Sequence, residues 1–156
     1  MNRTLVLLLL AACLACLPQT GRAQQAFRVD DSASQVLGSL VRMKWKDARP
    51  VRGASNELVG QTTVLTRLDM SPFRGRSGRV FMVLGPQSGP VRASWTTRGV
   101  LLPGELRDGE RTVVYAGLVG ADLFEDTLVL TITASADVFA QPDRLEFHFE
   151  FEPEGS

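Results

Sequence analysis

The side chains best suited to chemistry in this sequence are few, and the first is a lone histidine. His148 is the only histidine in the chain, and Glu146 and Glu150 flank it at two positions on either side. Residues two apart on a strand share a face, so a carboxylate there can orient the imidazole as a general base. The same alternation predicts that this face is solvated. A hydrolase that uses His148 is therefore the third hypothesis, behind two binding functions.

Other catalytic patterns are incomplete. The segment Gly75-Arg76-Ser77-Gly78 departs from a nucleophile elbow because its second glycine comes one residue early. Asp122, Glu125 and Asp126 form an acidic loop, but their spacing does not match a calcium-binding EF-hand. A single histidine also leaves too few ligands for a zinc site. We expect a non-enzymatic protein without metal or cofactor.

A basic loop offers a different chemistry. Arg74, Arg76 and Arg79 are set around two glycines after Phe73. Guanidinium groups grip carboxylate, sulfate or phosphate through paired hydrogen bonds. This loop is therefore a candidate ligand-binding site for an anionic glycan, a lipid headgroup or an acidic segment of a protein. The aromatic residues that stack on nucleic-acid bases are absent around it apart from Phe73, so we expect no nucleic-acid partner.

The part of the chain that positions these residues is preceded by a segment that resembles an export signal. Asn2 and Arg3 precede an apolar run, Leu5–Ala15, and Gly21-Arg22-Ala23 places small residues at a cleavage site. The apolar run is too short to span a bilayer, and the pattern is typical of a secretory signal peptide. We expect residues 1–23 to be removed and residues 24–156 to form one exported domain in the periplasm or at the cell surface.

The two cysteines belong to the signal. Cys13 and Cys16 both precede the expected cleavage site, so the mature domain has no disulfide. The stretch Leu10-Ala11-Ala12-Cys13 reads like a lipobox, and a lipid anchor on Cys13 is the alternative. The segment after Cys13 stays apolar, which favours simple cleavage.

The mature sequence alternates with a period of two, as strands do, and lacks helical periodicity. We expect about eight strands, near residues 26–30, 36–46, 62–70, 79–84, 91–97, 111–116, 127–135 and 144–151. Residues 47–61 are expected to form a loop, and Asp108-Gly109 favours a tight hairpin turn. Residues 80–84 and 112–115 are apolar on both faces and are expected in central strands. This spacing predicts a single antiparallel β-sandwich, immunoglobulin-like or jelly-roll in character.

The last strand has the clearest alternation. One face is expected inside and consists of Leu145, Phe147, Phe149 and Phe151. The other is expected in solvent and consists of Glu146, His148, Glu150 and Glu152. Such a strand closes its own sheet or pairs with an edge of another chain, as in pilus assembly. Trp45, Trp95 and Tyr115 are expected to anchor the core beside these phenylalanines.

Charge is unevenly distributed along the chain. Residues 28–111 carry 14 basic and 8 acidic residues, whereas residues 112–156 carry one basic and 9 acidic residues. This split indicates either head-to-tail contact between copies or two solvated faces of one fold. In outline the chain resembles small bacterial envelope sandwiches, including fimbrial subunits. The leading hypothesis is an exported binding or assembly subunit that contacts a protein partner or itself, and the alternative is a monomeric module that binds an anion through the arginine loop.

Overall fold

The chain is an antiparallel β-sandwich without α-helix in its described part. The computed structural model describes residues 25–38, 41–47, 56–87, 89–136 and 145–155, so the expected signal sequence, with Cys13 and Cys16, lies outside the described residues. The strands are β1 Phe27–Arg28, β2 Gln35–Leu37, β3 Lys44–Trp45, β4 Glu57–Asp69, β5 Ser77–Leu84, β6 Val91–Thr96, β7 Gly104–Arg107, β8 Arg111–Leu118, β9 Leu123–Ser135 and β10 Phe147–Pro153. A short 3₁₀ turn, Ser71–Phe73, links β4 to β5.

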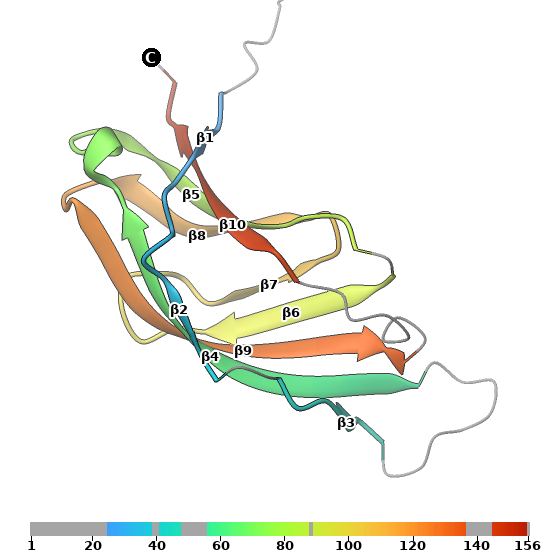
Figure 1. Cartoon of the computed structure of the whole chain (residues 1–156). Coiled ribbons are helices and arrows are strands. Elements are labelled where there is room, and N and C mark those ends of the chain that lie inside the picture. Colours follow the sequence, from blue (N-terminus) through green and yellow to red (C-terminus); the bar gives the residue numbers. More distant parts are fainter. Residues whose placement is uncertain (1–24, 39–40, 48–55, 88, 137–144, 156) are drawn as a thin grey trace, which may run out of the picture.

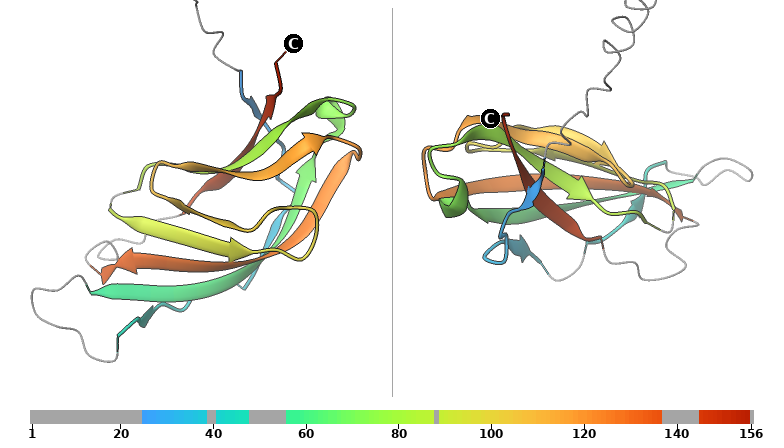
Figure 2. Two further views of the ribbon diagram at one scale, coloured as in Figure 1. Left: turned by 180° about the vertical axis from the view of Figure 1, so that it is seen from behind. Right: turned by 90° about the horizontal axis from the view of Figure 1, so that it is seen from above.

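Two antiparallel sheets make the two layers (Figures 1 and 2). Sheet A has the strand order β1-β10-β5-β8, and sheet B has the order β2-β4-β9-β6-β7, with β3 also paired to β4. The long strands β4 and β9 pair without interruption from Glu57 to Asp69. Strand β1 lies beside the end of β10, so the described parts of both chain ends meet at one edge of sheet A.

The core lies between the sheets and is built from the inward side of each alternating strand. Trp95, Phe149 and Phe151 are buried, as the sequence predicts. Tyr115 and Phe147 pack against this core but stay partly exposed. The fully inaccessible ring of Phe151 contacts Phe73 with a centroid separation of 4.6 Å. Aromatic packing of this kind joins the terminal strand to the β4–β5 connection.

The prediction of one strand over residues 36–46 is wrong, because this part of the chain contains two short strands, β2 and β3. Gly38 has φ +103°, a conformation that ends β2. Strand β3 pairs with Leu58 and Val59, neither of which belongs to the buried core. Trp45 is therefore 49% exposed and is not the core anchor that the sequence predicts.

Further differences lie at strand limits. Residues 57–61, expected in a loop, begin β4, because their alternation pairs in register with β9. Strand β7 was not predicted, since Leu106 is its only large apolar residue. The prediction of a central strand at residues 112–115 is wrong, because β8 forms an edge of sheet A. Strand β5 is central, as the sequence predicts.

The turn predicted at Asp108-Gly109 does form, and Gly109 has φ +71°. It joins β7 of sheet B to β8 of sheet A, so the strands that it connects belong to different sheets. Among the described residues no helix is both long and apolar enough to cross a bilayer.

Candidate functional site

The three arginines of the predicted anion site have three separate partners within the chain. Arg74 Nη1 lies 2.6 Å from Asp122 Oδ2. The guanidinium of Arg76 sits 5.9 Å from the centre of the Phe27 ring. Arg79 leaves this loop altogether, because it lies on β5, where it pairs with Glu152. The structure therefore spreads the three charges over different contacts of the fold.

The terminal strand is held by its own domain. Strand β10 pairs with β5 along its whole length and with β1 at Glu150 and Phe151. Of the predicted assembly face, Phe149 and Phe151 are buried and Phe147 and Leu145 pack against the core. These four side chains thus complete the sandwich of this chain.

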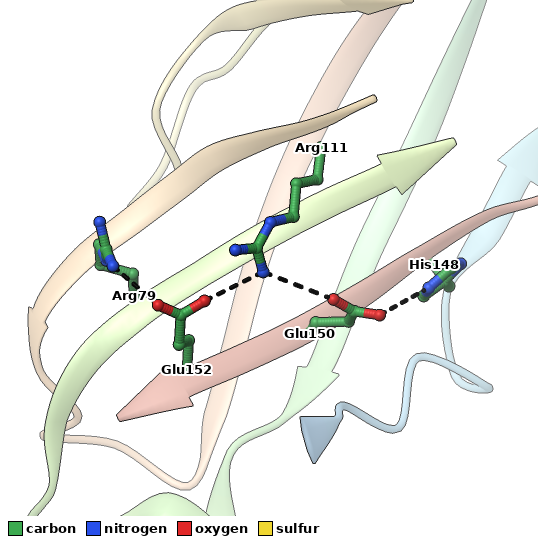
Figure 3. Close-up of polar contacts among 5 residues, drawn as sticks. All are labelled: Arg79, Arg111, His148, Glu150 and Glu152. Carbon is green, nitrogen blue, oxygen red and sulfur yellow. Dashed lines mark hydrogen bonds and ion pairs between the residues drawn. The ribbon is translucent and has the colours of Figure 1, made fainter. Parts of the chain in front are cut away.

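The opposite face of β10 carries a row of ion pairs across sheet A (Figure 3). The carboxylate of Glu152 lies between Arg79, at 2.8 Å, and Arg111, at 3.0 Å. The guanidinium of Arg111 also lies 4.2 Å from the centre of the Phe81 ring. Glu152 is therefore only 3% exposed, and its prediction as a solvated residue is wrong. Two arginines cover it and pair with its charge, which offsets the cost of burying the carboxylate.

His148 continues the row at its far end. Its Nε2 lies 3.2 Å from Glu150 Oε1, and the residue paired with it on β5 is Val83. Within the described residues Glu150 is its one polar side-chain partner. The imidazole thus has an orienting carboxylate but no neighbouring nucleophile in the described part of the chain.

The acidic loop predicted at Asp122, Glu125 and Asp126 is wrong in part, because Glu125 and Asp126 lie in strand β9. Its carboxylates contact groups of the protein. Asp126 accepts hydrogen bonds from the backbone N–H groups of Arg98, Gly99, Leu101 and Thr127, at 2.7 to 3.0 Å. The other two carboxylates of this loop are also engaged, Glu125 with Arg67 and Asp122 with Arg74. No group of three potential metal ligands occurs among the described residues.

The outer face of sheet B presents a cross-strand row that we call the basic row: Lys44, Val59, Thr133, Arg92 and Arg107. Each of these residues is directly opposite the next, from β3 through β4, β9 and β6 to β7. Directly opposed residues project to the same side of a sheet. At about 4.8 Å per strand, the row extends about 19 Å across the sheet.

Polar groups and two hollows border the basic row. The next cross-strand row consists of Gln61, Thr131, Ser94 and Glu105. A hollow of about 610 Å³ is lined by Arg42, Lys44, Gln61 and Thr131, among others. A second hollow, of about 540 Å³, is lined by Glu57, Arg92, Arg107, Asp108 and Thr133, among others. The face thus combines cations with hydroxyl and amide groups in shallow depressions.

The cations here are only partly neutralised. Arg42, Lys44 and Arg92 have no ion pair with the described residues, and Arg107 is 4.0 Å from Glu105. Glu57 is held by Lys46, and the hydrogen bond from this ammonium lowers the pKa of Glu57 below its ordinary value of 4.5. Glu57 also interacts with the charge of Arg92, but its direct partner is Lys46. Among the described residues, Lys44 and Arg92 therefore have no carboxylate within ion-pair distance, and Arg107 has only Glu105, at 4.0 Å.

The sequence pattern did not predict that the basic row forms on the outer face of sheet B. The outward positions of Arg42, Lys44, Arg92 and Thr133 follow from alternation. These residues become neighbours only through the pairing of β3 with β4, β4 with β9 and β9 with β6, which brings together three distant parts of the chain.

Comparison with known proteins gives no family. No protein-family model matches the sequence, and no curated protein matches it. Two solved structures are similar in fold. One is the C-terminal family 22 carbohydrate-binding module of Clostridium thermocellum Xyn10B, with 13% identity, a TM-score of 0.31 and coverage of 84% of this chain and 94% of that chain. The other is a xylan-binding domain of the same carbohydrate-binding family, with 11% identity, a TM-score of 0.25 and coverage of 86% and 88%. At these values the likeness carries no argument about ligand or mechanism.

Proposed function

We propose that this protein is an exported, non-enzymatic binding module of the bacterial cell envelope, and that the outer face of sheet B holds an acidic polysaccharide. The observation that carries the proposal is the basic row, in which Lys44, Arg92 and Arg107 flank Thr133 on one face. Carboxylate or sulfate groups pair with the cations, and sugar hydroxyls bond to the neighbouring hydroxyl and amide groups.

The spacing of the row supports a polymer over a small anion. Adjacent strands are about 4.8 Å apart, which is close to the length of one sugar unit along a polysaccharide. A chain laid across the strands therefore meets one side chain of the row per sugar. The hollows at Lys44 and at Arg92 give such a chain a depression at both ends of the contact.

The proposed export and the proposed location of the protein are supported by its sequence alone. The signal at residues 1–23 supports action in the periplasm or at the cell surface, where acidic glycans are available. Assembly into a fimbrial or surface complex through the terminal strand stays a prediction. A lipid anchor on Cys13 likewise stays an alternative, and mass spectrometry of the processed protein distinguishes it from cleavage before Gln24.

The test compares two charge-matched variants. We expect the wild-type protein to bind polygalacturonate, to bind its methyl-esterified form much more weakly, and to lose affinity as salt rises. The double variant Arg92→Ser/Arg107→Ser should lose about tenfold or more in affinity. The control, Arg74→Ser/Arg76→Ser, removes the same charge from the other predicted anion site and should change affinity by less than about twofold.

The control also decides between the two anion sites. A larger loss of polygalacturonate affinity in Arg74→Ser/Arg76→Ser than in Arg92→Ser/Arg107→Ser contradicts the proposal. It would place the anion site in the loop after Phe73. Equal binding of the charged and esterified polymers contradicts it as well. Circular dichroism and thermal unfolding of both variants establish that each remains folded.

A further inference from the structure

Strand β3 is an open edge of sheet B, because β4 is the one strand paired with it in the described part of the chain. The backbone N–H of Lys46 donates to the backbone oxygen of Glu57, at 2.9 Å. Lys44 and Lys46, two apart in the chain, therefore direct their main-chain groups toward β4, and Trp45 directs its own away. Among the described residues the N–H and C=O of Trp45 thus have no strand beside them. Such an edge pairs readily with another extended chain.

The side chains of this edge are apolar on one side and basic on the other. Trp45 projects toward the inner side of sheet B, yet it remains 49% exposed. Lys44 projects to the outer face, where it lines a hollow together with Arg42. Residues 41–47 carry three cations and one acid, Asp47. A strand added at this edge would therefore meet an exposed aromatic ring on one side and positive charge on the other.

These features favour an extended polypeptide as the occupant. A polypeptide offers N–H and C=O groups at the spacing of a strand, which a polysaccharide does not. A second copy of β3 would bring lysines opposite lysines, which is destabilising. The segment of this chain in which apolar and acidic residues alternate, β10, is paired with β5 in its own sandwich. The chemistry thus points to a segment of a different protein.

We propose that the β3 edge binds an extended polypeptide segment with alternating acidic and apolar residues, as a strand added antiparallel to sheet B. The strand pairs described in this sheet are antiparallel. The apolar side chains of the segment cover Trp45, and its carboxylates pair with Arg42 and Lys44. Directly opposed residues of an antiparallel pair exchange both hydrogen bonds, so an apolar residue opposite Trp45 binds the free N–H and C=O. This binding does not rest on the proposed polysaccharide site, although the two surfaces meet at Lys44.

The first test uses the synthetic peptide fluorescein-Glu-Val-Glu-Val-Glu-Val-Glu-Val-amide and fluorescence anisotropy. The wild-type protein should bind this peptide saturably and lose affinity as salt rises. N-methylation of the valines removes the donors that face β3 and should weaken binding about tenfold or more. N-methylation of the glutamates leaves those donors in place and should change affinity by less than about threefold. Equal effects of the two methylated peptides, or the absence of saturable binding, would overturn the proposal.

The second test addresses the aromatic ring. Trp45→Ala should weaken peptide binding about tenfold or more, whereas Trp45→Phe keeps an aromatic ring and should lose less than about threefold. Leu118→Ala is the matched control, at a leucine that is 60% exposed at the end of β8 in sheet A, and it should leave affinity within about twofold. Thermal unfolding establishes that the variants are folded.

The same measurements separate this proposal from the polysaccharide site. Trp45→Ala should leave polygalacturonate binding within about twofold, because Trp45 projects away from the outer face of sheet B. Equal losses of peptide affinity in Trp45→Ala and Leu118→Ala would contradict a partner strand at β3, whatever the polysaccharide result.

Discussion

Among single residues, two buried carboxylates stabilise the fold through contacts that the sequence does not predict. Asp126 gathers four backbone N–H groups from the segment after β6 and from its own strand. Glu152 is covered by Arg79, which lies 73 positions away along the chain. Both belong to acidic stretches that look solvated in the sequence, because their partners are remote. The alternation pattern predicted the strand of Glu152 but placed Asp126 in a loop, and it predicted the burial of neither residue.

Replacing Asp126 tests this role. Asp126→Asn keeps the size but loses the charge and puts an N–H₂ group against backbone donors. We expect urea unfolding to show a loss of about 2–4 kcal/mol, since hydrogen bonds to a charged group are strong and the site is buried. Asp122→Asn, at an exposed ion pair, should cost less than about 1 kcal/mol. Equal losses in the two variants would contradict the assigned role of Asp126.

At the element scale, the contact between β5 and β10 depends on a glycine. A Cβ atom on Gly78 would lie 2.5 Å from Phe151 Cζ and 2.6 Å from the backbone oxygen of Glu152. Phe151 is fully buried, so its ring has no room to withdraw. Gly78 thus lets the two strands and the aromatic core approach closely.

The variant Gly78→Ala should therefore destabilise the domain by about 1–3 kcal/mol or more through overpacking. Gly120→Ala is the control, because a Cβ there meets nothing within 4 Å. Both changes reduce the freedom of the unfolded chain alike, so the difference in their unfolding free energies isolates the clash. If thermal unfolding gives the two variants the same stability, the close packing at Gly78 is contradicted.

The two-residue alternation of the sequence predicted the strands that bury a continuous row of side chains. It did not predict the strands whose position depends on pairing with distant segments. Strands β5 and β6 were expected within two residues of their observed limits, and β9 and β10 within four, because each places a row of large apolar residues inside. Strand β7 has one such residue, and β3 has its tryptophan in solvent, so neither gives a reliable pattern. The basic row could not be predicted from the sequence for a related reason, because its residues become neighbours only through the order of the strands in sheet B.

At the scale of the whole molecule, the charge split has an internal explanation. Within the described residues, five ion pairs join an arginine of the basic part to a carboxylate of the acidic part: Arg67–Glu125, Arg74–Asp122, Arg79–Glu152, Arg111–Glu150 and Arg111–Glu152. The acidic part thus neutralises arginines of sheet A, Arg74 in the connection between β4 and β5, and Arg67 on β4 of sheet B. The cations of the basic row keep no such partner from the acidic part among the described residues.

This remaining positive face, on the outer side of sheet B, is the proposed ligand surface. The most direct measurement is a titration of the isotopically labelled protein with an oligogalacturonate, followed by backbone amide chemical shifts. We predict the largest shift changes at Lys44, Thr133, Arg92 and Arg107 and at their neighbours on the outer face of sheet B, with little change at Arg74 and Arg76. Changes concentrated around Arg74 and Arg76, or no changes at millimolar oligosaccharide, would contradict the account.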